Sequence, residues 1–256
     1  MRAFIALYFE GFNWLRRDKI FIPMMFAGLG ISIFASTASQ WSLEEFKKIF
    51  FDIGIGGFRL AGGLVAILWG ARMIHDALGE RSLDPRLAAP ISRSTWFLAR
   101  YAALATSLLI MGSVFAAWWQ CIMYFKGYGL LSNVQSWAFA LLTLEWLVLA
   151  GLAMMLATFG GFGLAIFTST ALWIAGLVAP LVAATKDPSN PGSSSVIVDS
   201  LADLWNFQRF NLIDQLASGT QYVDIADLTS RLAWAGSILV AILTAATWRF
   251  SERDLG

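Results

Sequence analysis

The 256-residue chain has little of what soluble enzymes and nucleic-acid-binding proteins need. It has one cysteine, Cys121, and one histidine, His75, which excludes an intramolecular disulfide, a cysteine-based metal cluster and a histidine-rich site. Only 14% of its residues are charged and its net charge is +1, so no basic field points to nucleic acid. It has no Gly-x-x-x-x-Gly-Lys phosphate loop, so the sequence contains no P-loop ATPase.

Long apolar runs are what the sequence has in excess. Hydrophobic residues make up 58% of the chain, against about 45–50% in soluble domains. Because a membrane-spanning helix needs about 20 apolar residues, the runs predict an all-α integral membrane protein with a single transmembrane domain over 1–256. The predicted spans are roughly 19–39, 51–74, 96–125, 136–158, 162–184 and 232–248, with the glycines of 158–163 dividing the fourth from the fifth.

The basic residues predict the orientation of these six spans. With the N-terminus inside, segments 1–19, 72–100 and 249–256 hold eleven Lys and Arg, against six in the outer segments. Both termini are therefore expected in the cytoplasm, with the chain in the cell (inner or plasma) membrane.

Residues 1–18 have the pattern of an interfacial helix. Apolar side chains fall on one helical face and polar ones on the other. The apolar face holds Phe4, Tyr8, Phe12 and Leu15, and the polar face holds Glu10, Asn13 and Arg17. A kinked continuation into the first span is the alternative.

The outer loop, about 185–230, is long enough to have structure of its own. Apolar residues recur at helical spacing in two groups, which predicts two short amphipathic or re-entrant helices folded against the spans or the outer leaflet. The second group is Phe210, Ile213 and Leu216. The loop has no His, Cys or Met, so it does not suggest a soft-metal site.

Two ionisable residues, Arg59 and Glu145, lie well inside predicted spans. Facing lipid, such a residue costs roughly 2.5 to 3.5 kcal/mol on insertion scales. Both spans run from outside to inside and both residues are at nearly the same depth, so we predict that they pair. The pair could lie on a substrate path or could be a structural link between helices.

Small residues recur at four-residue spacing in the second span. Gly57 with Ala61, and Gly62 with Ala66 and Gly70, predict a close helix contact, either at a dimer seam or inside the chain. Further along, Trp118 and Trp119 are expected in the outer aromatic belt.

The connection between the second and third spans, which we call the inner segment (75–96), reads HDALGERSLDPRLAAPISRSTW. Pro85 and Pro90 each disfavour helix at the preceding residue, and so bracket a short piece. Ser92 is suited to cap the third span. A solvated connector obeying the positive-inside rule would also explain its charge.

These residues resemble a family. Glu80, followed by LAAPISR (87–93) and a span starting WFLARY, resembles the pattern between spans two and three of permease subunits of ABC-2-type (type V exporter-like) ATP-binding-cassette transporters. The predicted N-terminal helix, six spans and outer-loop helices are similar to that family's layout. The phrase LWNFQRFNLID (204–214) is similar to its nitrous-oxide-reductase-maturation-like branch.

The resemblance implies that the inner segment is a coupling helix on a separate cytoplasmic ATPase. It implies export, a second permease copy or related permease as partner, no cofactor on this chain, and ATP and Mg used by the ATPase. An outer-face protein partner is also compatible with it. The residues it assigns to ATPase coupling are Glu80, Arg81, Leu83, Asp84, Arg86, Leu87, Pro90, Ser92 and Arg93.

Two other function classes are considered. An intramembrane enzyme needs clustered catalytic residues within the spans, and the sequence has neither HExxH nor GxSxG. A secondary transporter or scaffold would work without an ATPase, but no internal repeat of the kind many secondary transporters have is visible.

Overall fold

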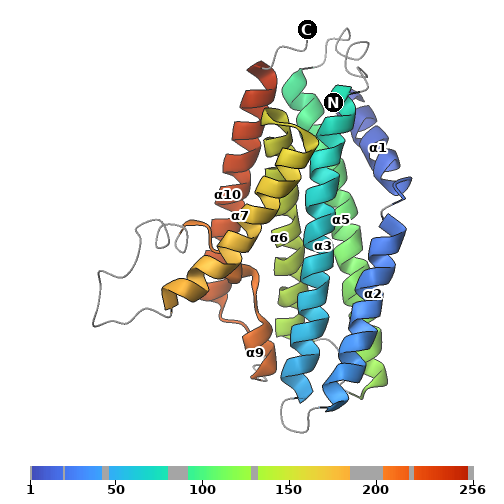
Figure 1. The fold of residues 1–256 in the computed structure, drawn as a ribbon, viewed down its shortest axis with the longest axis vertical. Helices are drawn as coiled ribbons and strands as arrows, with labels where there is room; N and C mark the ends of the chain where they lie inside the picture. Colours follow the sequence, from blue (N-terminus) through green and yellow to red (C-terminus); the bar gives the residue numbers. More distant parts are fainter. Residues whose placement is uncertain are drawn as a thin grey trace.

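The computed structural model describes residues 2–19, 21–41, 46–79, 92–127, 132–184, 204–218 and 222–252. Within these ranges the chain is all-α, with eight α-helices, two 3₁₀ turns and no strand. The longer helices run along one bundle axis (Figure 1). The elements are α1 (Arg2–Arg16), α2 (Phe21–Ala38), η1 (Ser39–Trp41), α3 (Phe46–Gly79), α5 (Arg93–Phe125), α6 (Asn133–Phe159), α7 (Phe162–Ala184), η3 (Phe207–Phe210), α9 (Ile213–Ala217) and α10 (Ile225–Glu252).

Five of these helices, α3, α5, α6, α7 and α10, are long and apolar enough to cross a membrane, which indicates a multi-pass membrane protein. The first predicted span corresponds to α2, whose apolar stretch Ile22–Ala38 is shorter. At 1.5 Å per residue the 18 residues of α2 extend about 27 Å, slightly less than a hydrocarbon core of about 30 Å.

Helix ends differ from the predicted ones where polar residues continue a helix. The helix α10 begins at Ile225, before the predicted span start at residue 232. The predicted C-terminal boundary of the outer loop, residue 230, is therefore wrong. The Asp224 carboxylate accepts from the Ala226 amide at 3.2 Å, and Asp227 pairs with Arg231 at 2.9 Å across one turn. These contacts satisfy the polar groups in the first turns of α10. The prediction had placed those turns in a loop because they are not part of an apolar run.

The turn between α6 and α7 lies where the glycines predicted it. Helix α6 ends at Phe159, and the Gly160 amide donates to the Leu156 carbonyl as a C-cap. At its other end α6 is fixed by a capping box, in which Ser132 and Gln135 each bond the other's backbone amide.

The small-residue stripe of α3 serves packing inside the chain. The Cα of Gly62 faces the Trp146 ring of α6, and a Cβ added at Gly70 would lie 2.6 Å from the Ala150 carbonyl oxygen. Trp119 is fully buried and stacks on Phe50 with ring centroids 4.6 Å apart, so its expected place in an aromatic belt is wrong. The sequence did not reveal this because core and interfacial tryptophans look alike in an apolar run.

Helix α1 packs on α5 through part of its predicted apolar face. Of that face, Leu15 is buried and Phe4, Tyr8 and Phe12 are partly buried; Leu7, which was not assigned to it, is buried as well. Figure 1 shows α1 along the upper part of the bundle, with α2 continuing down the same side. The start of α1 and the end of α10 lie at one end of the bundle, as the charge pattern predicts for the two termini.

Candidate functional site

Arg59 and Glu145, the two buried charges that the sequence paired, are in contact. Arg59 Nε, on α3, donates to Glu145 Oε2 at 2.7 Å and to Oε1 at 3.0 Å, on α6. The Glu145 side chain is fully buried, and that of Arg59 is 11% exposed. The contact neutralises two charges that neither helix could hold alone in hydrocarbon.

A third helix completes the shell of the Glu145 carboxylate. Trp173 Nε1, on α7, donates to Glu145 Oε1 at 2.7 Å, and the Trp173 ring is itself buried. Glu145 therefore receives hydrogen bonds from two directions, which satisfies both of its oxygens. The carboxylate ties α3, α6 and α7 together at one depth.

Arg59 also bonds to the chain that follows α7. Its Nη2 donates to the Phe207 carbonyl at 2.6 Å. Phe207 belongs to η3, within a stretch of 204–218 that we call the outer segment. Because Arg59 is about 17 Å along α3 from Lys48, at the start of the candidate span, the outer segment reaches towards the middle of the bilayer.

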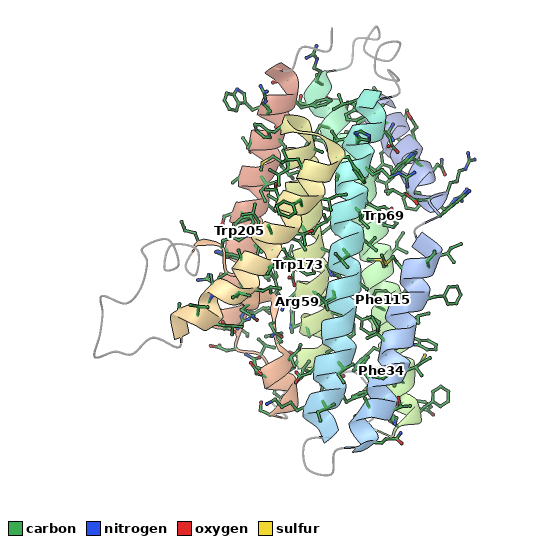
Figure 2. All side chains as sticks on the ribbon, viewed as in Figure 1. Phe34, Arg59, Trp69, Phe115, Trp173 and Trp205 are labelled. Atoms are coloured by element: carbon green, nitrogen blue, oxygen red, sulfur yellow. The ribbon has the colours of Figure 1, made fainter. Side chains whose placement is uncertain are left out.

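Side-chain bonds to backbone carbonyls anchor the rest of the outer segment. Trp205 Nε1 donates to the Leu172 carbonyl and Gln208 Nε2 to the Leu177 carbonyl of α7, both at 3.0 Å. From α10, Arg231 Nη1 reaches the carbonyls of Arg209 at 2.6 Å and Asn211 at 3.2 Å. Figure 2 shows Arg59, Trp173 and Trp205 at neighbouring heights in the middle of the bundle.

The outer segment is also buried by packing. Phe210, Ile213 and Leu216 are buried, so of the two predicted placements, against the spans or against the outer leaflet, the structure has these side chains packed against the spans, while Leu204 stays exposed. Phe207 fits against Gly176, where an added Cβ would lie 2.6 Å from both the Phe207 ring and the Trp205 carbonyl. Only a glycine in α7 allows so close an approach.

The residues assigned to ATPase coupling are described only in part. Glu80, Arg81, Leu83, Asp84, Arg86, Leu87 and Pro90 lie outside the described residues. Ser92 is the N-cap of α5, as predicted, with Oγ accepting from the Thr95 amide at 3.2 Å. Arg93 Nη1 donates to the Ser251 carbonyl at 3.3 Å, so the first turn of α5 contacts the last turns of α10.

Several residues in these contacts were not predicted from the sequence. Nothing in an apolar run distinguishes Trp173 from other tryptophans. The ion pair between Arg100 Nη2 and Glu10 Oε1, at 2.7 Å, was also missed, because Glu10 was assigned to the polar face of α1. The available signal was an arginine near the start of α5, Arg100, and a carboxylate on the predicted interfacial helix, Glu10.

No protein-family model matches this chain, and a search of curated proteins finds no relative. In the described ranges, no group of three or more His, Cys, Asp or Glu side chains is arranged to hold a metal ion.

Proposed function

We propose that this chain is the permease subunit of an ABC-2-type ATP-binding-cassette transporter, with ATP hydrolysed by separate subunits. The observation that carries the proposal is the Glu80 and Leu-x-x-Pro-Ile-Ser-Arg pattern, which lies between α3 and α5. The last turn of α3 and the first turn of α5 both lie at the end of the bundle where α1 starts and α10 ends (Figure 1). In the proposal α2 also crosses the membrane, which brings the number of spans to six. The chain works as a dimer.

The helix α3 is the element that would carry motion through this subunit. It is continuous over 34 residues, includes the first residues of the inner segment (75–79), and holds Arg59. A displacement of its inner end by an ATPase would move the guanidinium that bonds to Glu145 and to the Phe207 carbonyl. The outer segment is therefore the part that a movement of α3 would loosen, either for a substrate or towards an outer partner.

A purification from native membranes tests the proposal. We expect the tagged chain, extracted in mild detergent, to bring down a P-loop ATPase with vanadate-sensitive activity. Glu80→Arg or Arg93→Glu should reduce the recovered ATPase at least tenfold, whereas Lys126→Glu, a charge reversal at the other end of α5, should not. An ATPase-free particle that still transports would exclude the proposal.

A further inference from the structure

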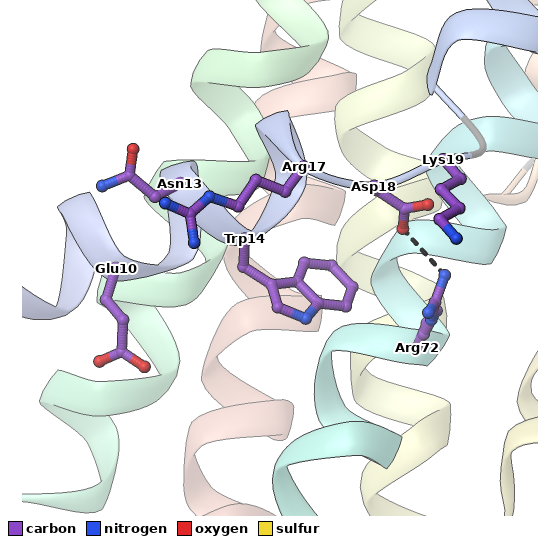
Figure 3. Close-up of a pocket in the computed structure, with 7 residues that line it drawn as sticks. All are labelled: Glu10, Asn13, Trp14, Arg17, Asp18, Lys19 and Arg72. Atoms are coloured by element: carbon purple, nitrogen blue, oxygen red, sulfur yellow. Dashed lines mark hydrogen bonds and ion pairs between the residues drawn. The ribbon is translucent and has the colours of Figure 1, made fainter.

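A polar pocket of about 710 Å³ opens between the end of α1 and the inner end of α3. It is lined by Glu10, Asn13, Trp14, Arg17, Asp18, Lys19 and Arg72. Arg72 bonds Asp18 at 3.0 Å and lies over the Trp14 ring, 5.5 Å from its centroid. Figure 3 shows the Asp18 carboxylate directed at Arg72, with the Lys19 side chain beside them.

The carboxylates here are already engaged, but three cations are not. Glu10 pairs with Arg100, and Asp18 pairs with Arg72. The side chains of Arg16, Arg17 and Lys19 are exposed and make no hydrogen bond or ion pair with the described part of the chain. The pocket and its rim thus present unmatched positive charge, which suits a phosphate.

The pocket lies at the depth of lipid headgroups. Arg72 is about 36 Å along α3 from Lys48, at the start of the candidate span, and a hydrocarbon core is about 30 Å thick. The charge pattern assigns this end of the bundle to the cytoplasm, where the leaflet carries anionic lipids. Trp14, beneath Arg72, is of the residue type that favours this interface.

An apolar slot of about 220 Å³ lies one helical turn further into the membrane along α3. Its lining is Phe12, Leu15, Arg16, Trp69, Ser107 and Ile110. The one hydroxyl in this lining, on Ser107, donates its hydrogen to the Ala103 carbonyl at 3.0 Å. That hydrogen is therefore not available to a ligand in the slot. Trp69 precedes Arg72 by three residues on α3, which places a slot for hydrocarbon below a pocket for an anion.

We infer that the pocket and the slot bind one anionic phospholipid of the cytoplasmic leaflet. The phosphate is held by Arg17 and Lys19, with Arg72 fixed behind them by Asp18, and an acyl chain occupies the slot. The lipid lies between α1 and α3, with its acyl chain also against Ser107 and Ile110 of α5, and so holds α1 on the bundle. This inference does not rest on the proposed function, since it needs neither an ATPase nor a substrate.

Native mass spectrometry of the delipidated full chain, titrated with phosphatidylglycerol or phosphatidylcholine, tests the inference. We expect one tightly bound phosphatidylglycerol per chain and no comparable site for phosphatidylcholine. Each cation near an anionic surface strengthens binding about fivefold, so Arg17→Gln/Lys19→Gln should weaken it about thirtyfold. The matched control Lys48→Gln/Lys126→Gln removes the same charge at the other end of the bundle and should bind normally.

Four results would overturn the inference. One is equal binding of the two lipids, and another is unchanged binding to Arg17→Gln/Lys19→Gln. Displacement of the lipid by glycerol phosphate at equal concentration would show a site for free phosphate. Loss of a co-purified ATPase from Arg17→Gln/Lys19→Gln, with lipid binding intact, would make this face a protein contact. We expect Arg17→Gln/Lys19→Gln to keep the melting temperature of the wild type, because these two side chains make no bonds within the described fold, whereas the control loses the bond from Lys126 Nζ to the Ser36 carbonyl.

Discussion

The Arg59–Glu145 pair gives the sharpest test of how this bundle is held together. Replacing Glu145 by Gln removes the charge that balances a buried guanidinium, and breaking a buried pair from one side costs about 3–5 kcal/mol. Arg59→Met leaves the fully buried carboxylate with only the Trp173 donor, and we expect a cost in the same range.

The double variant Arg59→Met/Glu145→Gln should cost less than the sum of the two single variants. It buries no unbalanced charge, and the amide oxygen of the new glutamine side chain can still accept from Trp173. It leaves the Phe207 carbonyl without its donor, at about 1–3 kcal/mol. With single variants at about 3–5 kcal/mol each, the double-mutant cycle should return a coupling of at least about 3 kcal/mol.

The assay is reversible unfolding in bicelles by titrated denaturing detergent, followed by tryptophan fluorescence, for the wild type and the three variants. Coupling below about 0.5 kcal/mol, as found for independent sites, would refute the reasoning, because the two charges would then not balance each other. Single variants that each cost under about 1 kcal/mol would refute it equally, since an exposed pair behaves in that way.

Further predictions concern the same contacts. Trp173→Phe replaces the buried indole by a smaller aromatic ring and removes a donor to a charged group, so it should lower the free energy of unfolding by at least about 1.5–3 kcal/mol in the same assay. Gly176→Val should loosen the outer segment and raise its amide hydrogen exchange at least tenfold, whereas Gly163→Val, where a Cβ meets open space, should not; equal exchange in both variants would contradict the packing. Glu10→Gln should cost less than Glu145→Gln, because the Glu10 carboxylate is 40% exposed and solvent screens its pair with the buried Arg100, and a cost matching that of Glu145→Gln would contradict this comparison.

The helices and one site contact could be predicted from sequence for physical reasons. Apolar runs fix where helices cross because no other element satisfies its backbone in lipid. Arg59 and Glu145 could be paired because they are the only charges deep in predicted spans and lie at matching depths.

The remaining contacts depend on tertiary structure. Trp173 and the Phe207 carbonyl are groups of a kind that recurs throughout the chain, so their role follows only from the approach of α7 and the outer segment to α6. The start of α10 was misplaced because the Asp227–Arg231 pair extends a helix beyond its apolar part. The i,i+4 spacing of this pair was the available signal in the sequence, but a search for apolar runs alone does not use it.

In the proposed function, ATP used by a partner chain moves α3 and loosens the outer segment. The most direct measurement is hydrogen–deuterium exchange of residues 204–218 in the purified complex, with and without ATP and vanadate. We expect faster exchange in the vanadate-trapped state, and no change when the ATPase is catalytically inactive. Identical exchange in the two states of an active complex would contradict it.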